Sequence, residues 1–133
     1  MKKEVLIGNF DMGWQSVTLI LRDGSGGEFC CIPDDGVCAR IVVGAGKNES
    51  DWHACFCSLM HEAWEMAMFQ ADLRYSPSNR TGIASHADYL FVMTHEQFHA
   101  CCAKVSEFMR PALPALEDGF KKWHKTNKRK TKK

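Results

Sequence analysis

The first third of the chain has the hydrophobic pattern of short β-strands separated by turns. Branched apolar residues run together or alternate with polar ones, and glycine- and aspartate-rich segments interrupt them. Tight turns of this kind favour an antiparallel meander. The sequence therefore predicts about four strands, at residues 5–8, 16–21, 28–32 and 39–43.

After this region the spacing of apolar residues becomes helical. Ser50 or Asp51 can cap a first helix that runs to about residue 74, with apolar positions recurring every three or four residues. A loop follows the helix, and a further short strand is expected at residues 89–93.

A second main helix is predicted over residues 95–109. Thr94 can cap its start, and Pro111 and Pro114 are expected to end it, because proline lacks the N–H that an interior helical position donates. A short third helix is expected over residues 116–123.

These elements make a single α+β domain over residues 1–120: an antiparallel sheet, two main packed helices and a short third helix.

The net charge of +1 hides an uneven distribution of charge along the chain. Residues 121–133 carry eight lysines and arginines and no acid, so nine basic and sixteen acidic residues give the rest a charge of −7. We expect residues 121–133 to be a flexible basic tail.

The tail is also a candidate for non-specific binding to nucleic-acid phosphates, with Trp123 available to stack on bases. The candidate residues are Lys121, Lys122, Lys125, Lys128, Arg129 and Lys130.

The composition narrows the class of protein. Apolar residues make up 45% and charged residues 25%, which is typical of a globular domain and not of a disordered chain. No apolar run is long enough for a membrane span or a signal peptide, so we expect a cytoplasmic protein with no membrane partner. The seven cysteines form no CxxC pair, which argues against a zinc ribbon and favours reduced thiols.

Two histidine motifs are the candidate chemistry. His61-Glu62-Ala63-Trp64-Glu65 has the form HExxE, and His95-Glu96-Gln97-Phe98-His99 has the form HExxH. Residues four apart share one face of a helix, so both can reach one metal ion, and the intervening glutamate can take a proton from bound water.

The strand at residues 39–43, a short glycine-containing loop and a helix with Leu59-Met60-His61-Glu62-Ala63 resemble a minimal zincin-like metallopeptidase core. Small phage and prophage proteins of unassigned function also carry such a core, and the resemblance covers about residues 39–110. It implies that residues 39–43 form an edge strand and that the cofactor is zinc. It also implies His61 as first ligand, Glu62 as general base and a third ligand from the second helix, His95 or His99. The second ligand position falls on Glu65, where the family has histidine.

Other assignments of the same residues remain open. His95 and His99 can be the ligand pair, with Glu96 as base and His61 or Glu65 as third ligand. Either way, antiparallel packing of the two helices would bring His61, Glu65, His95 and His99 around one point. A dinuclear carboxylate site ranks last, because four-helix bundles usually host it.

His53 and Cys57 extend the row of His61 and Glu65 along the first helix in steps of four. His53 lies two turns, roughly 12 Å, from His61, so it is expected to be an ordinary surface residue.

From the two histidine motifs, the leading hypothesis is a zincin-like metalloprotein with peptide hydrolysis as its candidate activity and an unidentified protein or peptide as substrate or partner. One alternative is a non-catalytic, phage-type accessory or host-interaction protein in which the motifs are structural. The other is nucleic-acid association through the tail.

Overall fold

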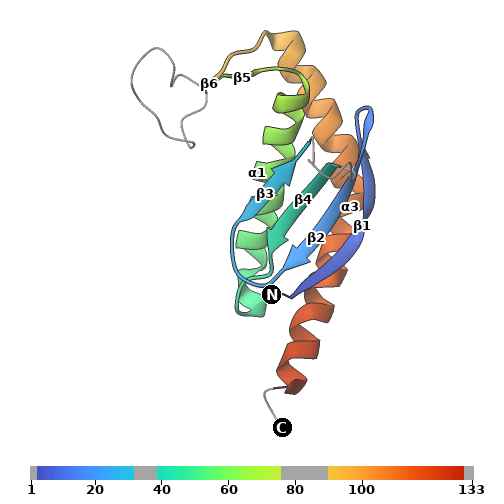
Figure 1. Cartoon of the computed structure of the whole chain (residues 1–133), viewed down its shortest axis with the longest axis vertical. Coiled ribbons are helices and arrows are strands. Elements are labelled where there is room, and N and C mark those ends of the chain that lie inside the picture. Colours follow the sequence, from blue (N-terminus) through green and yellow to red (C-terminus); the bar gives the residue numbers. More distant parts are fainter. Residues whose placement is uncertain (1–2, 32–38, 76–89, 131–133) are drawn as a thin grey trace.

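The computed structural model describes residues 3–31, 39–75 and 90–130 (Figure 1). Two helices and a four-stranded sheet account for most of them, and a two-stranded ribbon lies at one end. In chain order the elements are β1 (Glu4–Met12), β2 (Gln15–Arg22), β3 (Gly27–Cys30), β4 (Ala39–Gly44), the short 3₁₀-helix η1 (Glu49–Asp51), α1 (Trp52–Gln70), β5 (Arg74–Tyr75), β6 (Leu90–Phe91) and α3 (His95–Lys130).

The main sheet is mixed, with strand order β1-β2-β4-β3. β1 pairs with β2 and β3 pairs with β4 in antiparallel fashion, but β2 and β4 are parallel. The prediction of a purely antiparallel sheet is therefore wrong. The physical reason is that the turn after β2 sends β3 far enough away for β4 to enter between them, held at one end by the Gly44 N–H bond to the Gly26 carbonyl (2.7 Å).

β4 is an interior strand, so the expectation that residues 39–43 form an edge strand is also wrong. Ile41, Val42 and Val43 are all buried, as expected of a central strand that is flanked by a neighbouring strand on each side. The edges of the sheet are β1 and the four-residue β3.

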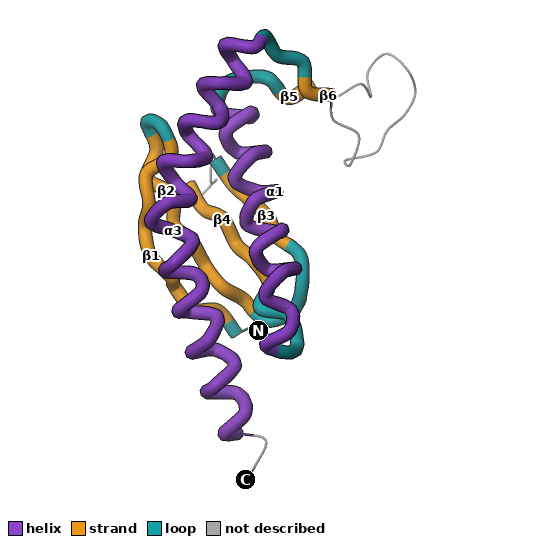
Figure 2. The backbone as a smooth tube through the Cα atoms, turned by 180° about the vertical axis from the view of Figure 1, so that it is seen from behind, coloured by secondary structure: helices purple, strands orange, loops and turns teal. Residues whose placement is uncertain are grey.

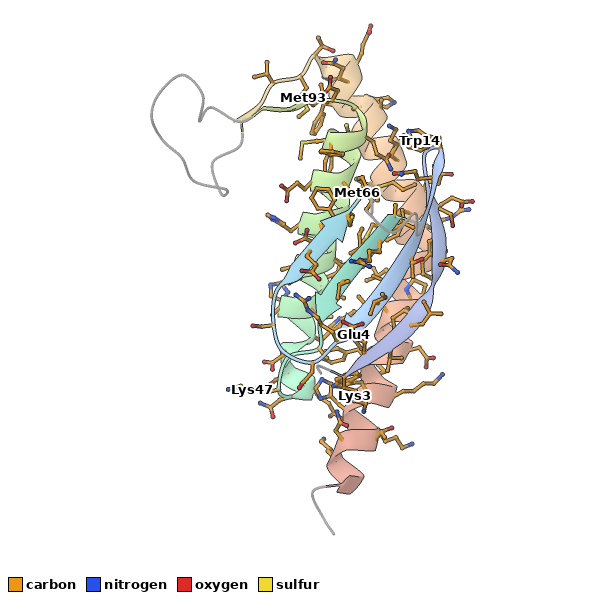
Figure 3. The ribbon with its side chains drawn as sticks, viewed as in Figure 1. Lys3, Glu4, Trp14, Lys47, Met66 and Met93 are labelled. Atoms are coloured by element: carbon orange, nitrogen blue, oxygen red, sulfur yellow. The ribbon has the colours of Figure 1, made fainter. Side chains whose placement is uncertain are left out.

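Both helices cover the same face of the sheet (Figure 2). Alternating residues of β2 and β4 point toward the helices, and α1 and α3 contribute buried side chains that face the sheet. Together these side chains form the core layer. Met66 of α1, labelled in Figure 3, is fully buried in this layer. The fully buried centre includes Val17, Leu19, Leu21, Ile41, Val43, Leu59, Met66, Phe108 and Leu116.

α3 is one helix of 36 residues that contains both Pro111 and Pro114. The predicted end near residue 109 is wrong, and the predicted third helix and the first ten residues of the tail, through Lys130, are part of α3. Both prolines are exposed, so the carbonyls that lose a helical N–H partner lie on the solvent side. On the opposite side a continuous buried stripe holds the helix against the core: Phe108, Ala112, Leu116, Phe120 and Trp123.

The remaining boundaries differ from the predictions by a few residues. α1 ends at Gln70, four residues before the predicted end, and Asp72 with a positive φ of 56° begins the turn that follows. The strand predicted at residues 89–93 is the two-residue β6, which pairs with β5. Among the described residues, neither helix combines the length and the apolar character needed to cross a membrane.

Candidate functional site

The loop Gly44–Asn48 and the side chain of Asp51 set the start of α1. The Asp51 carboxylate accepts hydrogen bonds from the backbone N–H groups of Lys47 (2.7 Å) and Asn48 (3.0 Å). These backbone bonds lower the pKa of Asp51. Asp51 occupies the N-cap position of α1, as the sequence predicts, but its carboxylate bonds back to the preceding loop and makes no cap bond to an N–H of α1.

His61 and Glu65 form a pair on the outer side of α1. The His61 Nε2 atom lies 3.3 Å from the Glu65 Oε2 atom, across one helical turn. The His61 side chain is 70% exposed and the Glu65 side chain 17% exposed, so the pair is open to solvent at the histidine. Two of the four predicted metal ligands are therefore in contact.

Glu62 points in a different direction, into the contact between α1 and the edge strand β3. Only 7% of its surface is exposed. The nearest strand residue is Gly27, where a Cβ atom would lie 2.8 Å from the Glu62 Cγ atom. The absence of a side chain at Gly27 leaves room for the carboxyl group.

Burial raises the pKa of Glu62, because an ionised carboxylate loses hydration in this position. His61 acts in the opposite direction, whereas the neighbouring carboxylates of Glu65 and Glu28 add to the rise. A carboxyl group that holds its proton to higher pH can act as an acid or a base nearer neutrality.

The HExxH motif forms the exposed first turn of α3. His95, Glu96 and His99 all face solvent. Thr94 caps the helix as predicted: its Oγ1 accepts a bond from the Gln97 N–H (3.2 Å), and the Gln97 Oε1 accepts one from the Thr94 N–H (2.8 Å). This reciprocal bonding is a capping box, so the motif starts the helix as well as offering histidines.

The two motifs lie on neighbouring helices but do not converge. The rings of Trp64 and Phe98 stack with their centroids 5.6 Å apart and an angle of 18° between the planes. This contact links the first turn of α3 to the second half of α1. Even so, within the described part of the chain no three His, Cys, Asp or Glu side chains lie close enough together to hold a metal ion.

His53 and Cys57 form a second contact on α1 that the sequence reasoning set aside. The Cys57 Sγ atom lies 3.5 Å from the His53 Nε2 atom, and both side chains are exposed. The spacing of four along a helix was the available signal for this pair.

The basic residues near the end of α3 are engaged with acidic partners. Lys121 pairs with Glu117 (2.7 Å), Lys122 with Asp118 (2.6 Å) and Lys128 with Glu49 (3.1 Å). Lys125 is exposed, and the side chains of Arg129 and Lys130 lie outside the described part of the structure.

Trp123 is buried, and the Lys3 ammonium sits 4.5 Å from its ring centre. Its ring is therefore not available to stack on bases as the sequence reasoning supposed.

The sequence matches no model of a known protein family, and the chain matches no curated protein and no solved structure. The function is therefore inferred from the residues and their geometry.

Proposed function

We propose that the chain is a zincin-like metalloprotein whose metal site begins with His61 and Glu65. The observation that carries this proposal is the 3.3 Å separation of the His61 Nε2 and Glu65 Oε2 atoms. Zinc binds imidazole nitrogen and carboxylate oxygen at about 2.0–2.1 Å, so two such ligands at a tetrahedral angle are about 3.3 Å apart. The pair therefore has the spacing that zinc needs without rearrangement of α1.

The third ligand in this proposal is His95 or His99. The stacking of Trp64 on Phe98 supports it, because each ring lies next to a motif residue in sequence: Glu65 follows Trp64 and His99 follows Phe98. Both histidines are exposed on the first turn of α3, so their side chains can rotate without loss of core packing.

Glu62 is the acid–base residue of the proposal, and Glu96 takes that role in the alternative assignment to the HExxH motif. A bound zinc ion would supply Lewis acidity toward a carbonyl group. Glu62 follows His61 in the chain, and its raised pKa suits a group that takes up and returns a proton.

The neighbouring strand supports a peptide as the substrate class. β3 lies at one edge of the four-stranded sheet in the described part of the chain. An extended peptide can add to such an edge through main-chain hydrogen bonds. A peptide bound in this way would run past Gly27, next to Glu62.

Metal binding is tested first, in a Cys57→Ser background that removes the exposed thiol of α1. We expect about one zinc ion per chain by elemental analysis and calorimetry, with binding lost in His61→Ala and strongly weakened in Glu65→Gln. Glu107→Gln, which removes an exposed carboxylate elsewhere on α3, is the matched control and should bind zinc normally. His95→Ala and His99→Ala then identify the third ligand. A background protein that takes up no zinc would overturn the proposal.

Hydrolysis is tested next, with the zinc-loaded protein and a library of unstructured peptides. Glu62→Gln should retain zinc and lose peptide cleavage by about 10²–10⁴-fold, because it removes only the acid–base group. Zinc binding without cleavage in the unsubstituted protein would instead favour the non-catalytic alternative, a metal-stabilised accessory or interaction protein.

A further inference from the structure

A second pair of metal-binding side chains lies on the same stripe of α1, nearer its start. We propose that His53 and Cys57 form a separate site for a thiophilic divalent ion such as Zn²⁺ or Co²⁺, in which one imidazole and one thiolate bind the ion together. This site is distinct from the proposed His61/Glu65 site and does not depend on it.

The geometry of the pair supports this assignment. Zinc–sulfur bonds are about 2.3 Å and zinc–nitrogen bonds about 2.0–2.1 Å, so a thiolate and an imidazole at a tetrahedral angle are about 3.6 Å apart. The Cys57 Sγ and His53 Nε2 atoms are 3.5 Å apart. Both are exposed, so an ion reaches them without opening the fold, and solvent can fill its other coordination positions.

Cys57 differs from the cysteines around it. Cys55 and Cys101 point into the core, and burial raises the pKa of Cys55 to about 12 and raises that of Cys101. A metal ion binds the thiolate form, which a buried thiol reaches only at high pH. Among the described cysteines, only Cys57 is exposed.

The charge of α1 also favours a cation. The helix contains two glutamates, Glu62 and Glu65, and neither lysine nor arginine from Trp52 to Gln70. An approaching divalent ion therefore meets no lysine or arginine side chain of this helix.

The stripe divides into two pairs of different chemistry. Cys57 is four residues from both His53 and His61, but in the structure it contacts His53, and His61 contacts Glu65. The first pair offers nitrogen and sulfur, and the second offers nitrogen and oxygen. Because thiolate ligands favour softer ions, the two pairs should differ in metal preference.

Cobalt(II) titration of the whole 133-residue chain tests the proposal. Thiolate bound to Co²⁺ gives a charge-transfer absorption in the near ultraviolet that nitrogen and oxygen ligands do not give. We expect this absorption in the unsubstituted protein and in His61→Ala. It should vanish in Cys57→Ser and require about tenfold or more cobalt in His53→Ala. Circular dichroism of each variant checks folding, which substitution of these exposed side chains should leave intact.

Three results would overturn the proposal: no thiolate absorption in the unsubstituted protein, an absorption that survives Cys57→Ser, or one lost in His61→Ala but kept in His53→Ala. The last result would pair Cys57 with His61 instead. The zinc experiment for the His61/Glu65 site uses the Cys57→Ser background, in which the His53/Cys57 site is absent. Either proposal can therefore be overturned without affecting the other.

Discussion

Glu62 shows how one residue can connect the packing of the fold with its candidate chemistry. The side chain lies between α1 and β3, where Gly27 leaves space for it and hydration is poor. An apolar side chain of similar size would pack there without losing the hydration that a charged group needs. The protein instead holds a carboxyl group whose ionised form is disfavoured, next to an exposed histidine and a second carboxylate. Such a conflict between stability and charge is typical of functional sites.

The raised pKa of Glu62 predicts how stability changes with pH. The folded protein holds the Glu62 proton to higher pH than the unfolded chain does, so the contribution of this residue to the free energy of unfolding falls as pH rises through the interval between the two pKa values. Glu62→Gln removes that loss. We expect the variant to be more stable than the unsubstituted protein at pH 7–8 and the difference to shrink toward pH 4, measured by urea unfolding.

Glu107→Gln is the matched control for this measurement, because it removes an exposed carboxylate from a helix. The pH-dependent difference should be absent or much smaller in that variant. If Glu62→Gln were less stable at neutral pH, the carboxylate would have a stabilising partner and the burial argument would be wrong.

At the residue scale, the sequence predicted the His61–Glu65 pair because the spacing of four alone determines that contact. It did not predict where His95 and His99 would lie relative to that pair. Their position depends on the axial register of α1 and α3, which contacts such as Trp64 with Phe98 set. Side-chain spacing within one helix carries no information on that register.

α3 shows that a buried stripe can outweigh local helix breakers. Pro111 cannot donate to the Glu107 carbonyl, and an interior proline costs a helix about 3 kcal/mol relative to alanine. The buried side chains on the opposite face, from Phe108 to Trp123, continue the helix despite that cost. The two prolines are visible in the sequence, and they led to the predicted helix end near residue 109. The packing of the opposite helix face against the core is visible only in the fold.

Pro111→Ala therefore should stabilise the protein, by about 1–3 kcal/mol, because it restores a helical hydrogen bond at an exposed position and removes no core contact. Chemical unfolding measures the change, and Glu107→Ala, an exposed substitution that keeps every backbone bond, is the control and should change stability by about 0.5 kcal/mol or less. Destabilisation by Pro111→Ala would show that a proline bend is needed for α3 to pack on both α1 and β1.

Strands show the same division between local and long-range information. The positions of β1 to β4 were predicted to within a few residues, since alternation and turns are local signals. The pairing of β2 with β4 was not predicted, because it joins residues such as Leu19 and Ile41 that are far apart in the chain. Burial of β4 on both faces is the signal that identifies it as a central strand.

At the scale of the whole molecule, α3 connects the other parts of the fold. Phe108 packs on Phe10 of β1, and Phe120 packs on Trp52 at the start of α1. Further along, His124 Nε2 donates to the Ala45 carbonyl (2.9 Å), in the loop between β4 and α1. The segment that composition marked as a basic tail is therefore part of the structural unit, at least as far as His124.

Removal of residues 121–133 tests this view directly. The truncation deletes Trp123 and His124, both buried, together with the Ala45 hydrogen bond. Loss of a buried tryptophan alone costs about 3–5 kcal/mol, against a total stability of about 5–15 kcal/mol for a typical domain. We expect the truncated protein to be unfolded or to melt far below the full chain in thermal unfolding followed by circular dichroism.

Truncation after Asn127 is the matched control, because it removes five of the eight cationic residues and keeps Trp123 and His124. Its melting temperature should stay close to that of the full chain, since the pair of Lys128 with Glu49 that it removes is exposed and exposed ion pairs contribute little. Equal stability of the full chain and the protein ending at Phe120 would mean that the end of α3 is a tail after all.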